Sequence, residues 1–213
     1  MKRAAAEILR EYGPFAGVDH VAGVTYDGRH VWFASGDRLN ALDPDSGEKV
    51  RAIDVAAHAG TAFDGRYLFQ LSGDQIQKID PHTGRVVATL AAPGGGSGLA
   101  WAEGTLWMGQ YRNRKIHQID PVTGAVLRTI ESNRFVTGVA WIDGELWHAT
   151  IDGEEKSDLR HIDAQTGEVL EALEMPPGAV VSGLECDGNG RFFCGGGSSG
   201  KVRAVRRPKR RAA

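Results

Sequence analysis

Short apolar runs separated by turn residues recur along the whole chain, and residues 98–130 show the pattern most completely. Leu99–Trp101 and Thr105–Met108 flank a short turn, which is typical of a β-hairpin. Lys115–Ile119 and Ala125–Ile130 then alternate apolar and polar residues at the period of a half-buried strand. The unit therefore predicts four antiparallel strands within about 35–40 residues, which is the size of one propeller blade.

This unit recurs five times along the chain. A glycine opens each first strand, and these glycines are Gly23, Gly60, Gly98, Gly138 and Gly183. Each second strand carries an aromatic residue, and these are Trp32, Phe69, Trp107, Trp147 and Phe193. The repeats predict a single domain of five blades, near residues 20–55, 58–92, 96–132, 136–174 and 181–207.

The fifth repeat stops after its third strand, Lys201–Val205, and a basic tail over residues 208–213 ends the chain. At the other end, Ala6–Tyr12 resembles the outer strands of the internal repeats. We therefore predict an all-β, five-bladed β-propeller of four-stranded antiparallel blades, whose N-terminal strand within residues 1–12 completes the last blade and closes the ring. Helix propensity over Ala4–Tyr12 favours a short helix instead, and the missing fourth strand argues against it.

Charge, apolar runs and cysteine content limit the location and the partners that we expect for this protein. No apolar run is long enough for a membrane span and the start lacks the apolar core of a signal peptide, so we expect a cytoplasmic protein with no membrane partner. Cys186 and Cys194 do not fall opposite one another in their predicted hairpin and are expected to be free thiols. The net charge of −2 gives no global attraction for nucleic acid. The basic tail is either a solvated terminus or a contact for nucleic acid or an acidic partner.

The repeated motif, Gly-Leu-Ala-Trp followed by Ile-Asp-Pro-x-Thr-Gly, resembles the repeat of the quinoprotein-like and virginiamycin B lyase-like propellers. The five-fold count resembles the plant-type glutamine cyclotransferases (glutaminyl cyclases). The resemblance covers nearly the whole chain, and it implies a propeller fold whose motif residues serve turns and packing. Glutamine cyclotransferases place acidic or amide residues just before the inner-strand glycines. The residues at those positions here are Ala22, Ala59, Ser97, Thr137 and Ser182.

Propellers commonly bind ligands at the channel mouth, on the face that carries the blade-to-blade connections and the loops between second and third strands. His20 and His58 precede the first two inner-strand glycines by three and two residues, so neighbouring blades bring both to one side of this mouth. Two imidazoles there suit a shared proton relay or a divalent metal ion, although a stable metal site usually has three or four protein ligands. Ordinary polar loop residues are the alternative interpretation.

Two further titratable residues are candidates for acid–base catalysis. Glu185 stands at an inner-strand position where the other blades have Thr25, Ala62, Ala100 and Ala140. Burial there would raise the pKa of its carboxyl group, unless the group reaches channel water or pairs with an arginine. His148 follows the second-strand aromatic of the fourth repeat. It either packs between blades or turns to the channel to act with Glu185.

The loops between second and third strands supply the candidate binding residues, which are Gln110, Tyr111 and Arg112, with Arg134 and Phe135 on the facing connection. An aromatic and basic loop suits a carboxylate, a phosphate or a planar ring. The longer acidic loop over residues 151–158 suits a lid or a cation site, or is a solvated surface loop.

Two functions follow from this reading of the sequence. The first is a small-molecule enzyme at the channel mouth, performing lyase, cyclase or hydrolase chemistry on a polar or anionic substrate. Its catalytic residues would be His20, His58, Glu185 and His148. A divalent metal is the one cofactor that these residues suggest, and the sequence indicates no organic cofactor. The second is a non-catalytic propeller that binds a ligand or serves as a protein-interaction scaffold.

Overall fold

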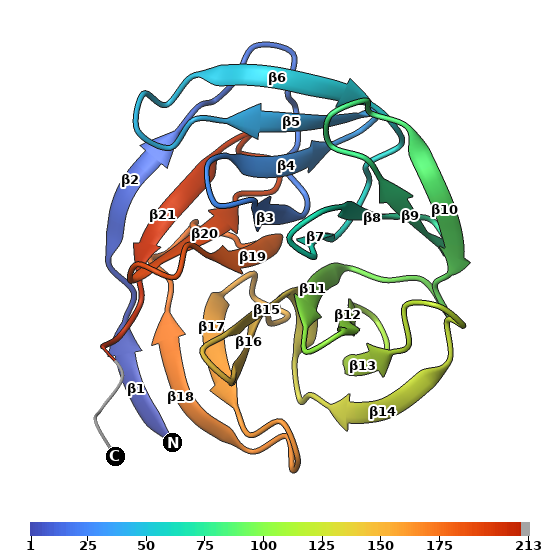
Figure 1. Ribbon diagram of the computed structural model, residues 1–213. Coiled ribbons are helices and arrows are strands. Elements are labelled where there is room, and N and C mark those ends of the chain that lie inside the picture. Colours follow the sequence, from blue (N-terminus) through green and yellow to red (C-terminus); the bar gives the residue numbers. More distant parts are fainter. Residues whose placement is uncertain (210–213) are drawn as a thin grey trace.

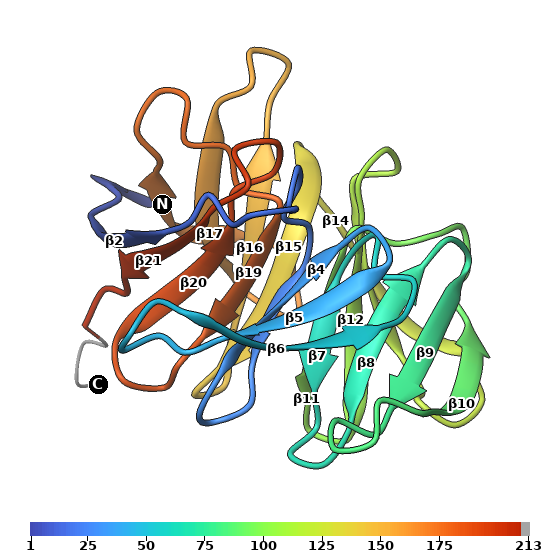
Figure 2. The same ribbon diagram turned by 90° about the horizontal axis from the view of Figure 1, so that it is seen from above.

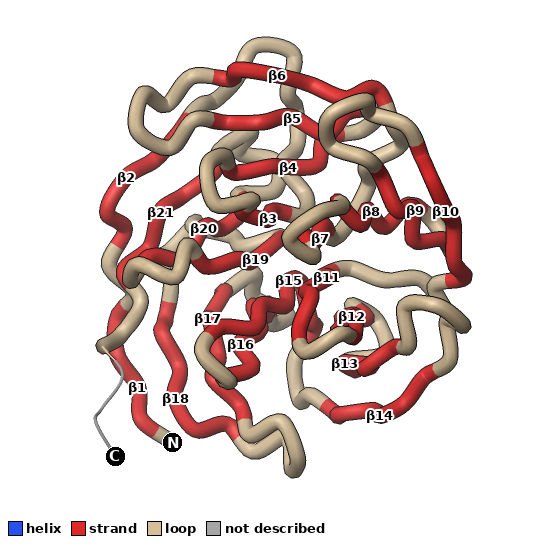
Figure 3. Tube along the Cα trace, in the orientation of Figure 1, coloured by secondary structure: helices blue, strands red, loops and turns tan. Residues whose placement is uncertain are grey.

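The computed structural model describes residues 1–209, and within them the chain forms strands and loops but no helix (Figure 3). The strands make five sheets arranged around a central axis (Figure 1). Seen at right angles to that view, the strands cross the thickness of the ring and the loops lie at its two faces (Figure 2). This is the predicted five-bladed β-propeller.

Each of the first three blades is built from four consecutive strands, ordered from the axis outwards. The first blade contains β3 (Val24–Tyr26), β4 (Val31–Ser35), β5 (Arg38–Leu42) and β6 (Lys49–Asp54). The second contains β7 (Thr61–Phe63), β8 (Leu68–Ser72), β9 (Gln75–Ile79) and β10 (Val86–Ala91). The third contains β11 (Gly98–Ala102), β12 (Thr105–Gln110), β13 (Lys115–Ile119) and β14 (Val126–Glu131).

The last two blades both take a strand from the N-terminal segment. The fourth contains β15 (Phe135–Ile142), β16 (Glu145–Ile151), β17 (Ser157–Ile162) and β18 (Val169–Glu174), with β1 (Lys2–Ala5) added in parallel outside β18. The fifth contains β19 (Gly183–Cys186), β20 (Arg191–Gly195) and β21 (Val202–Arg206), and β2 (Ile8–Tyr12) completes it antiparallel to β21.

The predicted closure of the ring by the N-terminal strand is confirmed, with one correction. Residues 1–12 do not form a single strand of the last blade, because β1 pairs with the fourth blade and only β2 pairs with the fifth. The division falls at Ala6, which is buried between the two blades and donates its backbone N–H to the carbonyl of Glu174. Residues 210–213, the end of the predicted basic tail, lie outside the described residues.

Neighbouring blades meet at seams filled with apolar side chains, and aromatic rings of the described residues contact each other across four of these seams. One such pair is Trp147 of the fourth blade and Phe192 of the fifth, at 4.9 Å between ring centroids. Trp101 of the third blade stacks on Phe69 of the second at 5.4 Å between ring centroids. The next seam repeats this arrangement with Trp141 and Trp107 at 5.5 Å. At the junction of the first and last blades, Tyr26 packs on Phe193 at 5.8 Å. The second-strand aromatics therefore hold one blade against the next, which is where most apolar surface leaves water.

The inner-strand glycines form a closed ring around the axis, made of Gly23, Gly60, Gly98, Gly138 and Gly183. A Cβ atom placed on any one of them would lie only 2.4–2.7 Å from backbone atoms of the next blade's inner strand. The contacts run in order around the ring, and the last glycine meets the backbone of the first blade. Glycine is therefore required here by close backbone approach, and the opening left at the axis is narrow.

The two faces of the ring carry different loops. The turns that join the third and fourth strands of the first four blades lie on one face, which we call the turn face. Their aspartates are Asp43, Asp80, Asp120 and Asp163, and each accepts backbone N–H groups two and three residues on. These hydrogen bonds lower the pKa of each carboxyl group, so the aspartates serve to hold the turns. The opposite face, with the blade-to-blade connections, is the mouth face.

The two cysteines are free and buried, as predicted. Cys186 lies opposite Phe192 in the sheet and Cys194 lies opposite Leu184, so the two side chains do not meet across the hairpin. Burial raises the pKa of the Cys186 thiol to about 11 and that of Cys194 to about 12. Both thiols are therefore protonated and unreactive at neutral pH. No helix that could cross a membrane occurs in residues 1–209.

Candidate functional site

A pocket of about 300 Å³ opens at the axis on the mouth face. Every blade contributes to it the residue that precedes its ring glycine, namely Ala22, Ala59, Ser97, Thr137 and Ser182. Its titratable lining residues are His20, His58 and Tyr111. We call this the mouth pocket. Among residues 1–209 no carboxylate lines it, so its histidines and phenol are the groups placed for proton transfer.

His20 and His58 both line the mouth pocket. Both side chains are solvent-exposed. Nδ1 of His58 lies 3.0 Å from the hydroxyl of Ser72, and its Nε2 lies 3.9 Å from a carboxylate oxygen of Asp37. Because Ser72 fixes one ring nitrogen, the other is left to face Asp37 or a ligand.

The hydroxyl groups of the mouth pocket differ in their hydrogen bonding. Ser97 donates to backbone carbonyls of Gly109 and Val136, and Ser182 donates to those of Val21 and Ala22. The buried hydroxyl of Thr137 has no hydrogen-bond partner among the described residues. An unsatisfied buried hydroxyl is costly, and a polar ligand group near Thr137 would relieve that cost.

A second hollow of about 440 Å³ adjoins the mouth pocket and shares His58 and Tyr111 with it. Its floor is the glycine-rich connection around Gly94–Gly96, and Arg112 lies at its edge. Gln110 is almost fully buried and donates from Nε2 to the carbonyls of Pro93 and Gly95. Gln110 therefore holds the connection in place, while the exposed guanidinium of Arg112 is the group available to an anion.

Tyr111 and Phe135 face each other, as the sequence suggested. Their rings stack at 4.8 Å between centroids and 17° between planes. The guanidinium of Arg114 lies over the other side of the pair, 4.6 Å from the Phe135 centroid. The stack forms an aromatic wall beside the mouth pocket, since Tyr111 lines that pocket and is 42% exposed.

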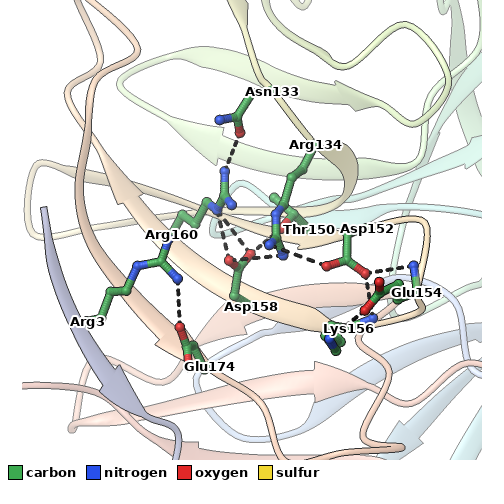
Figure 4. Close-up of polar contacts among 10 residues, drawn as sticks. All are labelled: Arg3, Asn133, Arg134, Thr150, Asp152, Glu154, Lys156, Asp158, Arg160 and Glu174. Atoms are coloured by element: carbon green, nitrogen blue, oxygen red, sulfur yellow. Dashed lines mark hydrogen bonds and ion pairs between the residues drawn. The ribbon is translucent and has the colours of Figure 1, made fainter.

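Arg134 lies in a network of charges instead of pointing freely at the mouth. Figure 4 shows its guanidinium between the carboxylates of Asp152 and Asp158, each at 3.4 Å. Asp158 is buried and also accepts from the buried Arg160 at 3.0 and 3.1 Å and from the hydroxyl of Thr150. The network ties the connection before Phe135 to the fourth blade, which makes Arg134 a positioning residue for the aromatic wall.

The acidic loop over residues 151–158 is folded by the same contacts. Asp152 accepts the backbone N–H groups of Glu154 and Lys156, and the side chains of those two residues form an ion pair with each other. Protein donors therefore occupy the carboxylates of Asp152, Glu154 and Asp158, while the side chain of Glu155 is exposed. Within residues 1–209, no group of three or more His, Cys, Asp or Glu side chains could hold a metal ion.

Glu185 lies on the other side of the glycine ring from the mouth pocket, because it follows the ring glycine Gly183 by two residues on β19. Its carboxylate accepts from the hydroxyl of Thr25 at 2.9 Å and from the backbone N–H of Cys186 at 2.8 Å. Burial raises its pKa to about 7, against the lowering effect of these two hydrogen bonds. The raised pKa is the predicted one, but the structure does not bring Glu185 together with His20 and His58.

His148 points away from the axis, into the groove between the third and fourth blades beside Arg160. It is almost completely buried, and its Nδ1 atom has no hydrogen-bond partner among the described residues. Burial, aided by the charge of Arg160, lowers its pKa to about 3. The imidazole is therefore neutral at physiological pH, and it does not meet Glu185.

Two features of this region are not predicted from the sequence. Ser97 and Thr137 differ from the cyclotransferase pattern, although each precedes a ring glycine and so must line the mouth. The network of Asp158 and Arg160 is the second, because the alternation in Ser157–Ile162 places both charges on a strand without showing which side chains they meet.

No protein-family model matches this sequence, and no curated protein sequence matches it. Among solved structures, the glutaminyl cyclase of Myxococcus xanthus superposes with a TM-score of 0.80 at 22% identity, over 96% of this chain and 97% of that one. The hydrazine synthase of Kuenenia stuttgartiensis gives 0.54 at 16% identity, over 84% and 56% of the two chains. The WD40 propeller domain of Doa1 gives 0.55 at 18%, over 87% and 63%. The resemblance to glutaminyl cyclase propellers is thus confirmed for the fold.

Proposed function

We propose that this propeller binds a small polar or anionic molecule in the mouth pocket and moves protons on it, with His20 and His58 as acid and base. The observation that carries the proposal is the convergence of both imidazoles on a pocket to which all five blades contribute. Imidazole exchanges protons near neutral pH and can serve as donor or acceptor, so two of them suit a reaction in which one group loses a proton and another gains one.

The surroundings of the pocket supply binding groups of the matching kind. The stacked Tyr111 and Phe135 offer an apolar wall, and the exposed guanidinium of Arg112 suits a carboxylate or phosphate. Thr137 offers a buried hydroxyl without a partner among the described residues. A ligand with a flat or aliphatic part and one anionic or amide end would use all three.

Cyclisation of an N-terminal glutamine is the first reaction to test, because the glutaminyl cyclase of Myxococcus xanthus shares the fold over nearly the full length of both chains. In such a reaction the α-amine attacks the side-chain amide carbon, and ammonia leaves. One imidazole would take the proton from the attacking amine and the other would protonate the leaving nitrogen. Small residues replace the acidic and amide residues expected before the ring glycines, so this chemistry would depend on the histidines alone.

The test is an assay of ammonia release from peptides with N-terminal glutamine, together with a panel of small carboxylic acids and amides screened by thermal shift. We expect His20→Ala and His58→Ala each to lower turnover by about 100-fold or more, the usual contribution of general acid–base catalysis. His82→Ala is the matched control, since this exposed histidine lies in a turn on the opposite face.

Turnover that survives both mouth substitutions would contradict the proposal. Binding without turnover would favour the second candidate, a ligand-binding or scaffold propeller. Two observations favour that candidate: no carboxylate of the described residues lines the mouth pocket, and the hydroxyls of Ser97 and Ser182 already donate to backbone carbonyls. Addition of divalent metal in the same thermal-shift screen tests the predicted metal site, and a stabilisation abolished by either histidine substitution would support it.

A further inference from the structure

A third cavity, separate from the two on the mouth face, lies on the turn face at the seam between the first and second blades. Its volume of about 610 Å³ exceeds the 300 Å³ of the mouth pocket. The lining includes, from both blades, the turn between the first and second strands. It also includes the turn between the third and fourth strands of the second blade. We call this the seam cavity. It shares no lining residue with the mouth pocket, so what it binds is a separate question from the proposed function.

The seam cavity occurs where the aromatic packing between blades is incomplete. The equivalent pairs at three other seams are Tyr26 with Phe193, Trp101 with Phe69 and Trp141 with Trp107, and all make ring contacts. Here the corresponding residues are Trp32 and Phe63, and within residues 1–209 they make no ring contact with each other. Both line the cavity, and Phe63 is only half-buried. Trp32 is almost fully buried, with 2% of its surface exposed, so the aromatic surface left for an occupant is that of the half-buried Phe63.

The charge of the seam cavity is positive. Arg29, Arg51 and Arg66 line it, and none of them forms an ion pair with a carboxylate of the described chain. Arg51 donates to the backbone carbonyl of His82, and Arg66 lies 4.9 Å from the ring centroid of Tyr67. All three guanidiniums keep donors for an incoming anion.

The two carboxylates of the seam cavity are already occupied by their own turns. Asp27 accepts from the backbone N–H groups of Arg29 and His30 and from the indole of Trp32. Asp80 accepts from the backbone N–H groups of His82 and Thr83. Since these acids are directed into turns, they do not neutralise the arginines by direct contact.

We infer that the seam cavity binds a small aromatic anion of the nucleoside phosphate class. The phosphates would be held by Arg29 and Arg66 at the two turns, with Arg51 between the blades. The base would pack against the half-buried ring of Phe63. Guanidinium groups bind phosphate in a planar, bidentate manner, and a ring that stacks on an aromatic side chain adds affinity beyond that of the charges alone.

Isothermal titration of the intact protein with adenosine diphosphate tests the inference, with adenosine and inorganic pyrophosphate as the two half-ligands. We expect the diphosphate to bind at least about tenfold more tightly than either half-ligand, since it uses both charge and stacking. Arg66→Ala and Arg29→Ala should each weaken binding by about tenfold, the typical effect of losing a charge-assisted hydrogen bond. Arg85→Ala is the matched control, because this exposed arginine does not line the cavity.

Phe63→Leu tests the contribution of the aromatic ring independently of that of the arginines, because leucine keeps apolar volume in the seam but removes the aromatic face. It should weaken the diphosphate by about fivefold or more and leave pyrophosphate unchanged. The inference is overturned if no binding occurs at millimolar diphosphate. It is also overturned if pyrophosphate or adenosine binds as tightly as the diphosphate, or if Arg85→Ala weakens binding as much as Arg66→Ala. Each variant's thermal unfolding shows that it is folded before titration.

Discussion

Glu185 shows how one buried carboxyl group can lower the stability of the fold above neutral pH. Its carboxyl group lies on the innermost strand of the last blade and reaches Thr25 on the first, with no positively charged partner among the described residues. Burial raises the pKa from 4.5 to about 7. The folded state therefore binds a proton at pH values where the unfolded chain has lost it, and stability must fall as pH rises through this range.

Replacement of Glu185 by Gln should remove this pH dependence. The protonated carboxyl contributes its full stability below about pH 4.5, and this contribution is lost as the pH rises through 7. Glutamine stays neutral and can still accept from Cys186 and donate to Thr25. We expect urea unfolding to show little difference at pH 5 and a gain on the order of 2–3 kcal/mol for the variant at pH 9. A variant less stable than the parent at pH 9 would contradict the assigned environment.

At the scale of elements, the strands were predictable because each repeat shows the same turn residues and the same alternation. The five inner hairpins and the closing strand β2 follow from that pattern. The separate strand β1 does not, because Lys2–Ala5 is exposed and held by pairing with β18 rather than by burial. The ion pairs of Arg134 are not predictable either. The sequence shows that Arg134 lies on a basic connection, but not that the carboxylates of Asp152 and Asp158 lie beside it. Ion pairs between distant segments leave no periodic signal.

The inner strands give the sharpest test of the ring geometry. A Cβ atom at Gly98 would lie 2.7 Å from backbone atoms of Gly138, which cannot move without displacing the next blade. We expect Gly98→Ala to cost about 3 kcal/mol or more, or to prevent folding, as overpacking against fixed backbone does. Gly153→Ala is the control, because its Cβ meets nothing within 4 Å and its φ is not left-handed. That control should be neutral or stabilising by up to about 1 kcal/mol in the same urea titration. Equal effects of the two substitutions would refute the close approach.

For the whole molecule, closure depends on a short N-terminal segment that contacts three blades. β1 pairs with the fourth blade, and β2 supplies the outer strand of the fifth. Tyr12, at the end of β2, is buried between the fifth and first blades and donates its hydroxyl to the carbonyl of Pro44. Glu11 pairs with Lys201 and with the buried Arg203. The two parts of the segment therefore differ in what they bury.

Two truncations distinguish these parts. Removal of residues 1–5 takes away exposed side chains and the surface ion pairs of Lys2 and Arg3, so we expect a loss of about 1 kcal/mol or less. Removal of residues 1–12 exposes the edge of β21, leaves Arg203 without its carboxylate and opens the seam beneath Tyr12. A ring opened at one seam loses packing on both sides of it, so this variant should lose its single cooperative unfolding transition and aggregate through the free edge. A synthetic peptide of residues 1–12 added to it should restore the transition, because it can re-form the outer strand. Unchanged unfolding of the longer truncation would show that the three remaining strands of the last blade suffice to close the ring.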